Sequence, residues 1–184
     1  MKILIILSTI IVLIQFIMWI KTTQKRLKIR IKYFEGATKL KKIKKGNWID
    51  VYANKDVYIR VGENALVPLG FALELPQGWE GHLAPRSSTF KSWGIIQTNS
   101  VGIIDDSFIG DNDEWHMPVY CLQGRRTENG EEVSDCTKTE GTWIRKGDKI
   151  GQFRVIEVMP QIEFKEIESF GNKDRGWYGS TGKR

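Results

Sequence analysis

Arg86, Ser87 and Ser88 form a segment whose side chains are suited to phosphate chemistry. An arginine presents a planar fork of donors and serine hydroxyls add single donors, so the three together can hold phosphate oxygens. The segment follows a predicted strand, which would place it in a turn whose backbone N–H groups can also bind an anion. An isolated Arg-Ser-Ser run is more often a solvated turn, and on these residues alone both interpretations stay open.

A glycine-rich segment at residues 174–182 offers similar donors near the end of the chain. Arg175, Ser180 and Thr181 can bind phosphate oxygens, and Tyr178 can stack on a nucleobase. The alternative is a frayed tail, because a polar, glycine-rich terminus has little surface to bury.

A carboxylate and two amides occupy strand-like surroundings elsewhere in the chain. Ile103 and Ile104 lead into Asp105, and a carboxylate at the end of an apolar strand is costly unless it is paired or used. Asp105 could accept a proton from water as a general base, or it could close a turn that caps the strand. Asn99 could hydrogen-bond to a base or hold a turn, and Gln152 could be an amide at the edge of the core.

Short apolar runs separated by turn residues must position these groups. The runs at residues 57–61, 72–75, 117–122 and 150–156 predict β-strands. Glycines punctuate the chain, and few segments have helical periodicity. The pattern predicts an all-β fold, a distorted jelly roll or β-barrel, in which residues 123–143 form a polar hairpin or excursion.

The composition restricts the class of protein. With 184 residues, 41% hydrophobic and 27% charged, the chain can form one domain with a core and is not disordered. Two cysteines and two histidines exclude a disulfide scaffold and a Cys-only zinc site. Residues 21–45 hold eleven Lys or Arg and one acid, whereas residues 46–184 hold sixteen basic and twenty-one acidic residues. The acidic body argues against nucleic-acid binding.

The N-terminal residues 3–20 are almost wholly apolar and are followed by basic residues. Eighteen residues is the lower limit for a membrane-spanning helix, and the basic flank would lie in the cytoplasm. Three interpretations stay open. The segment is a membrane anchor for a cytoplasmic catalytic domain, or a start assigned upstream of the true one near Met18 or Leu27, or a buried helix.

The expected organisation therefore has four parts. An apolar helix at residues 1–20 precedes a basic segment at residues 21–45 that leads into the first strands. The β domain covers residues 46–170, and residues 171–184 form a flexible arm. Apolar and basic residues alternate from Leu27 to Tyr33, which favours a strand over a segment that contacts lipid.

The order and spacing of these segments resemble the five motifs of the trimeric dUTP diphosphatases (dUTPases). Asn99 stands six residues before Asp105, as in the family, and the resemblance covers about residues 28–184. The five motif-like segments lie at residues 45–53, 84–88, 99–110, 147–153 and 175–182.

The resemblance implies Mg²⁺-dependent hydrolysis of dUTP to dUMP and pyrophosphate, with water attacking the α-phosphorus. Asp105 is similar to the acid that activates this water, and Asp50 to the residue that supports Mg²⁺ through water. Asn99 would bind uracil beside Gly102, and Phe108 would stack on the deoxyribose and exclude a 2′-hydroxyl.

The resemblance also implies phosphate-binding residues and an assembly. The phosphates would be held by Arg86, Ser87, Ser88 and Gln152. The terminal arm would close over the γ-phosphate and the base with Arg175, Tyr178, Gly179, Ser180 and Thr181. In the family this arm reaches the site of another subunit, so a homotrimer with sites between subunits is expected.

Several residues depart from the dUTPase pattern. Ser88 replaces the usual Gly and is similar to the related dCTP deaminases, Ser107 replaces a second Asp, and Phe108 replaces a Tyr. A dCTP deaminase, a bifunctional enzyme or a catalytically silent nucleotide-binding regulatory module are therefore the alternatives. The strand at residues 115–122 lacks the general acid/base Glu that a deaminase needs, which favours the diphosphatase.

Overall fold

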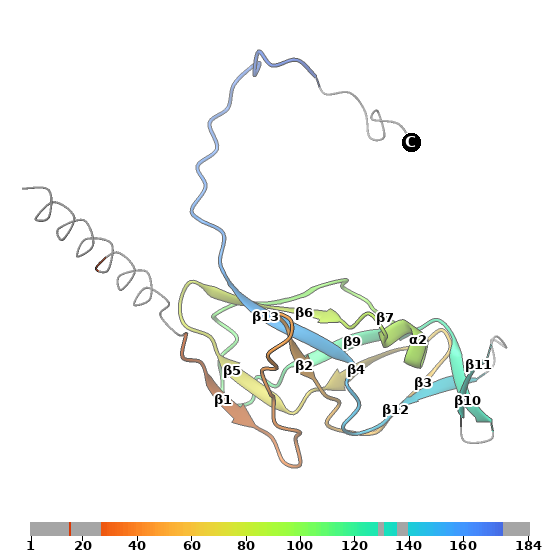
Figure 1. Ribbon diagram of the computed structural model, residues 1–184. Helices are drawn as coiled ribbons and strands as arrows, with labels where there is room; N and C mark the ends of the chain where they lie inside the picture. Colours follow the sequence, from red (N-terminus) through yellow and green to blue (C-terminus); the bar gives the residue numbers. More distant parts are fainter. Residues whose placement is uncertain (1–14, 16–26, 129–130, 136–139, 175–184) are drawn as a thin grey trace, which may run out of the picture.

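The computed structural model describes Gln15 and residues 27–128, 131–135 and 140–174. Short strands dominate these residues, as expected for an all-β protein (Figure 1). The elements are β1 (Arg30–Tyr33), β2 (Ile49–Val51), β3 (Val57–Arg60), β4 (Asn64–Pro68), β5 (Phe71–Glu74), β6 (Trp79–Pro85), α2 (Thr89–Trp93), β7 (Ile95–Gln97), β8 (Gly102–Ile104), β9 (His116–Cys121), β10 (Gly124–Glu128), β11 (Glu131–Asp135), β12 (Gly141–Ile144) and β13 (Gly151–Glu157).

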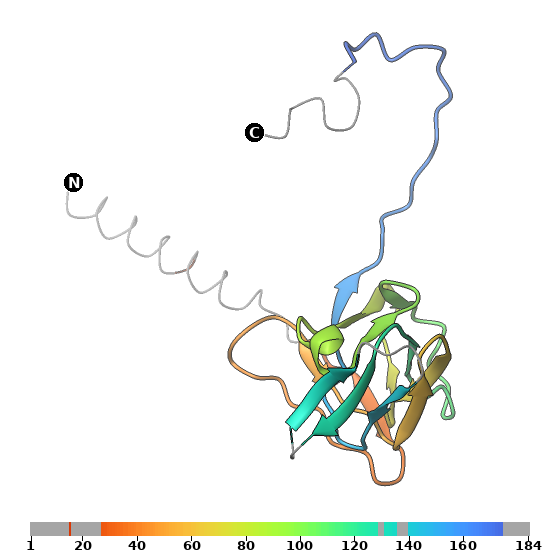
Figure 2. The same cartoon turned by 90° about the vertical axis from the view of Figure 1, so that its right-hand side faces the viewer.

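Two larger sheets form most of the body. One has the strand order β2-β13-β6-β8 and the other the order β4-β9-β7, and every pairing in them is antiparallel. The pairs β1-β5, β12-β3 and β10-β11 complete the fold. Strands distant in sequence lie side by side around one core, so the expected jelly-roll or barrel class is confirmed (Figures 1 and 2).

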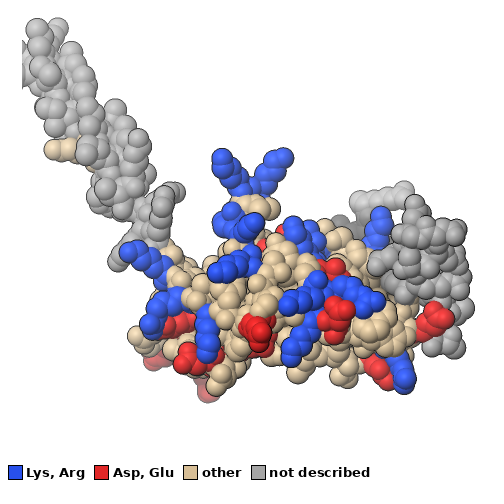
Figure 3. Space-filling model, turned by 90° about the horizontal axis from the view of Figure 1, so that it is seen from below, with Lys and Arg blue, Asp and Glu red and all other residues tan. Residues whose placement is uncertain are grey.

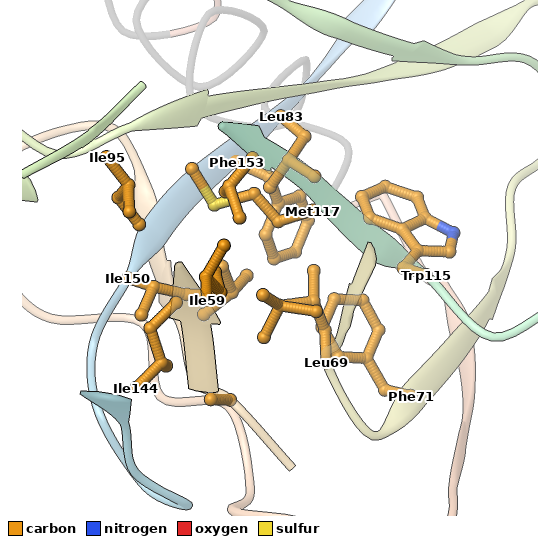
Figure 4. Packing of buried hydrophobic residues seen from close by; sticks show 14 of the residues in the cluster. Ile59, Leu69, Phe71, Leu83, Ile95, Trp115, Met117, Ile144, Ile150 and Phe153 are labelled. Carbon is orange, nitrogen blue, oxygen red and sulfur yellow. The ribbon is translucent and has the colours of Figure 1, made fainter. Parts of the chain in front are cut away.

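Bulky apolar side chains from both sheets fill this core (Figure 4). The ring of Trp115 lies 5.3 Å from that of Phe71 and 5.3 Å from that of Phe153, measured between centroids. Gly81 on β6 makes room for Trp115, because a Cβ atom there would come within 2.3 Å of the indole ring. Burial of the apolar positions that alternate along β6 and β9 fixes the register of these strands.

The predicted strands agree with the structure at the runs singled out above. The alternating segment after Leu27 contains β1, and residues 123–143 contain the hairpin of β10 and β11 followed by β12. Within the described part of the chain, no helix is both long and apolar enough to span a bilayer. The predicted apolar helix at residues 1–20 falls outside the described residues, apart from Gln15, and stays a prediction.

After Glu157 the chain leaves the body as an extended arm (Figures 1 and 2). It carries large apolar side chains in solvent, among them Met159 at 73%, Phe164 at 88% and Phe170 at 83% exposure. The exposed segment therefore starts earlier than Gly171, the expected start of the arm. On the face seen in Figure 3, acidic and basic side chains are interspersed over the body.

Candidate active site

Three strands bring the phosphate-binding candidates together. In the order β2-β13-β6, Gln152 on β13 is in register with Asp50 on β2 and with Ala84 on β6. The Gln152 amide donates to the carbonyl of Pro85 over 3.2 Å, and Arg86 follows Pro85 directly. Sheet pairing thus joins segments about a hundred residues apart into one polar cluster.

The guanidinium of Arg86 is held on two sides. Its Nε lies 3.0 Å from Oδ1 of Asp50, and Nη1 donates to the carbonyl of Lys149 over 3.2 Å. The Nζ of Lys149 lies 3.5 Å from the other oxygen of Asp50. Two cations share one carboxylate whose side chain is only 19% exposed, so the cluster carries an excess positive charge that suits a phosphate.

A buried hydroxyl fixes the turn that carries Arg86. Thr89 is 1% exposed, and its Oγ1 accepts the N–H of Arg86 and donates to the carbonyl of Ile150, both over 2.9 Å. Ser87 is exposed, and Ser88 makes no side-chain capping bond to α2. The structure therefore ties the second motif-like segment to the fourth, and it leaves the Ser88 hydroxyl uncommitted to the helix.

The carboxylate of Asp105 lies at the end of β8 and faces solvent. Its Oδ1 accepts hydrogen bonds from the backbone N–H of Ser107, over 2.9 Å, and from the Ser107 hydroxyl. The hydroxyl bond, and then the N–H bond, lower the pKa of Asp105 from its usual range. Asp106 has a separate structural role, because its Oδ2 accepts the N–H of Gly78 over 2.6 Å.

Ser107→Ala is expected to move the acidic limb of the pH–activity profile to higher pH. A general base must be ionised, and loss of the hydroxyl raises the pKa of Asp105, so the base becomes protonated at a pH where the parent is still active. The profile of kcat/KM measures this shift, with Ser92→Ala on α2 as the control. An unchanged limb, or one moved to lower pH, would contradict the role of Ser107.

Asn99, Gly102 and Phe108 line one hollow of about 320 Å³, together with apolar atoms of Leu83 and Pro118. The adjoining hollow of about 340 Å³ contains Asp105 and shares Phe108. The Phe108 ring is 41% exposed, which leaves a face for stacking. The structure thus places an amide, an aromatic ring and a carboxylate beside each other, as a nucleoside with a reacting phosphate would need.

The amide of Asn99 is oriented by a residue that the sequence did not single out. Gln97 is buried, and its Nε2 donates to the carbonyl of Leu83 over 3.0 Å and to Oδ1 of Asn99 over 2.8 Å. The Asn99 amide nitrogen is then directed to Gly102, where a Cβ atom would lie 3.5 Å from it. A Cβ atom at this position would make ordinary van der Waals contacts with Leu83, Asn99 and Gln97.

Asp105 and Arg86 lie far apart within one chain. Ile104 pairs with Gly81 in an antiparallel register, so Asp105 lies beside Glu80 near the start of β6, whereas Arg86 follows the other end of that strand. At about 3.3 Å per residue the two positions are separated by roughly 17 to 20 Å. Arg86 also contacts Asp50 on β2, on the side of the sheet away from β8. This separation is longer than a triphosphate group.

The site offers few ligands for a metal ion. Among the residues that the structure describes, no three His, Cys, Asp or Glu side chains form a metal-binding group. Asp50 is engaged by Arg86 and Lys149. These residues fit a Mg²⁺ ion that is held mainly by substrate phosphates and water, with one carboxylate at hand, which is how Mg²⁺ is commonly bound at phosphates.

The candidate residues of the terminal arm lie outside the described residues. They are Arg175, Tyr178, Gly179, Ser180 and Thr181. Sequence reasoning missed Lys149, Thr89 and Gln97. Lys149 lies within the fourth motif-like segment, and this position in the sequence could have identified it as a candidate site residue.

The fold is an all-β barrel or jelly roll that carries a cationic cluster around Arg86 and, apart from it, a hollow lined by Asn99 and Phe108. The family model described as dUTPase matches residues 44–113. The SPbeta prophage-derived deoxyuridine 5′-triphosphate nucleotidohydrolase of Bacillus subtilis (strain 168) is 46% identical over 159 residues, which are 86% of this chain and 100% of that protein. The chain belongs to the dUTPase family.

More distant relatives agree with this assignment. A deoxyuridine 5′-triphosphate nucleotidohydrolase of Finegoldia magna is 32% identical over 71% of this chain and 80% of its own length. The dUTPase of Staphylococcus bacteriophage 80alpha, solved with dUPNHPP, superposes with a TM-score of 0.66 at 18% identity, covering 85% of this chain and 99% of that one. The dUTPase of phage phi11 of S. aureus superposes with a TM-score of 0.62 at 20% identity, covering 78% and 99%, and coordinates a structural Mg(II) ion. These two likenesses concern the fold.

Proposed function

We propose that the chain hydrolyses dUTP to dUMP and pyrophosphate. The observation that carries the proposal is the ionised carboxylate of Asp105 beside a hollow that holds the amide of Asn99 and the ring of Phe108. The 46% identity to a deoxyuridine 5′-triphosphate nucleotidohydrolase supports the choice of substrate.

The reaction asks for an oriented water and neutralised phosphates. Asp105 accepts a proton from water while the water oxygen forms a bond to the α-phosphorus. The bond between the α-phosphorus and the oxygen that bridges to the β-phosphorus breaks, and pyrophosphate is released. Arg86, Ser87, Ser88 and Gln152 hold the phosphate oxygens, and Lys149 adds a second cation to the cluster. Such positioning and charge stabilisation supply most of the catalysis in reactions of this kind.

Asn99, Gly102 and Phe108 would bind the nucleoside. The amide of Asn99 would hydrogen-bond to the edge of uracil, and the Phe108 ring would stack on the deoxyribose and leave no room for a 2′-hydroxyl. Gly102 lines the hollow beside the amide. Since a site that excludes a hydroxyl by shape needs no donor, the missing hydroxyl of a Tyr at position 108 does not oppose this role.

Mg²⁺ is proposed as the cofactor. When bound, it would neutralise the phosphate oxygens, and Asp50 would face it through water, as a residue that also holds Arg86 in place. The Mg(II) ion described for the phage phi11 dUTPase is consistent with this family using the metal.

A site formed between neighbouring chains would bring an Asp105 and an Arg86 close enough to act on one substrate. Because Asp105 and Arg86 of one chain are too far apart for one substrate, we infer that Asp105 of one copy faces Arg86 of another in a homotrimer. The exposed apolar side chains of residues 159–170 would be covered by a neighbouring copy. The arm would then close the site with Arg175, Tyr178, Gly179, Ser180 and Thr181.

Deamination has less support from the structure. The strand β9 carries no carboxylate, and Glu114, which precedes it, accepts the N–H of Gly70 over 2.8 Å. That carboxylate is thus committed to the backbone.

The test of the proposed function follows pyrophosphate and ammonia from dUTP and dCTP, with Mg²⁺ and with a chelator. Mg²⁺-dependent pyrophosphate from dUTP alone is the expected result. Ammonia from dCTP would show a deaminase, and binding of dUTP without any product would show a silent nucleotide-binding module.

A further inference from the structure

The loop between β8 and β9 carries Asp105, Phe108 and Asp111, and Asp111 contacts the N-terminal strand β1. Lys32 on β1 donates from Nζ to the carbonyl of Asp111 over 2.6 Å, and the same nitrogen lies 3.6 Å from the Asp111 carboxylate. Lys32 precedes Asp111 by 79 residues. The contact therefore joins the start of the described β fold to this loop.

The loop has little packing on this side. An open hollow of about 500 Å³ lies between residues 109–111 and the strands β1 and β5. Arg30 and Lys32 line the hollow from β1, and Glu74 lines it from β5. Arg30 is engaged by Glu74. Apolar residues also line the hollow, but Lys32 is the side chain on β1 that reaches across it to Asp111.

The following residues are fastened to other parts of the backbone. Asp113 accepts the N–H of Gly110 over 2.6 Å and donates its own N–H to the carbonyl of Gly110 over 3.1 Å. A Cβ atom at Gly110 would approach the Asp113 carboxylate to 2.8 Å. Together with the bond from Gly70 to Glu114, these contacts tie Gly110 and Glu114 to their surroundings, and Phe108 precedes this segment by two residues in the same loop.

We propose that Lys32 is a positioning residue for the active site. It holds Asp111 against β1, and this contact sets the position of Phe108 and Asp105 relative to the nucleoside. The role rests on the proposed function. It adds a specificity determinant outside the five motif-like segments, on the strand β1.

The expected consequence is a loss of sugar discrimination. The Phe108 ring excludes a 2′-hydroxyl only while its position is fixed. A more mobile loop between β8 and β9 should therefore accept UTP more readily relative to dUTP. The acid Asp105 is carried by the same loop, and its displacement should lower kcat more than it changes KM.

Lys32→Met tests this proposal because it keeps the aliphatic stem and removes the donor. Because the Lys32 and Asp111 side chains are 47% and 91% exposed, we expect kcat/KM for dUTP to fall about twofold to fivefold, and the preference for dUTP over UTP to fall with it. Amide hydrogen exchange of a peptide covering residues 105–114 should become faster. Lys41→Met, in the exposed loop before β2, is the matched control and should behave as the parent.

Two further variants distinguish loss of the contact between Lys32 and Asp111 from a general loss of stability. Lys32→Arg keeps a donor and should restore part of the selectivity. Asp111→Asn keeps the carbonyl that accepts the shorter bond and should retain most of it. Exchange and selectivity in Lys32→Met equal to those in Lys41→Met would overturn the proposal. If the parent releases no pyrophosphate from dUTP, the proposed function fails, whereas hydrogen exchange still decides whether Lys32 holds the loop.

Discussion

Asp105→Asn is expected to lower kcat for dUTP hydrolysis by about 10²- to 10⁴-fold, the range typical for loss of a general base. An amide at this position keeps the size and the acceptor oxygen for Ser107, but it cannot take a proton from water. Binding of dUTP and the thermal unfolding temperature should change little, because Asp105 is exposed and supports no core contact.

Asp106→Asn is the matched control, since it makes the same chemical change one residue away. Its remaining oxygen can still accept the N–H of Gly78, so activity should stay within a few-fold of the parent. Single-turnover rates with saturating dUTP measure the chemical step in both variants. A near-normal rate in Asp105→Asn would mean that another group activates the water.

Arg86→Gln is expected to lower kcat/KM by about 10²- to 10³-fold, the usual cost of removing one preorganised donor from developing charge. The guanidinium is held by Asp50 and the Lys149 carbonyl before substrate arrives. The variant loses both the charge and this preorganisation. Arg86→Lys keeps the charge without the planar fork, so it should recover only part of the activity.

Arg60→Gln, on the exposed edge of β3, controls for the loss of one positive charge. Steady-state kinetics with dUTP and Mg²⁺ compare the three variants with the parent. Equal activity in Arg86→Gln and Arg60→Gln would remove Arg86 from the phosphate site.

The local sequence pattern predicts much of this fold, because the alternation or apolar run of a strand is visible within a few residues. Alternation marked β1, and apolar runs marked β3, β5, β9 and β13. The apolar stretch before Asp105 predicted β8, whereas the exposure of the Asp105 carboxylate was not predicted. The exposure of residues after β13 was not predicted, since Met159, Phe164 and Phe170 are apolar residue types that usually lie in a core, although here they lie in solvent.

The contacts that orient the site depend on pairing between distant strands, which a single sequence does not reveal. The ion pair of Asp50 with Arg86 follows from the register of β2, β13 and β6. Ser107 was noted only as a departure from the family pattern, although its hydroxyl lowers the pKa of Asp105. Whether Asp50 supports Mg²⁺ and whether the arm residues bind substrate stay predictions.

The most direct test of the account asks whether Asp105 and Arg86 of different chains form one site. Asp105→Asn and Arg86→Gln chains are refolded together in equal amounts, and pyrophosphate release from dUTP is measured. Each variant alone should be nearly inactive. In random trimers, half of the chains offer an intact Asp105 and half of their neighbours an intact Arg86, so the mixture should recover about one quarter of the parent activity. A co-assembled mixture as inactive as its components would place both groups in the site of a single chain and contradict the account.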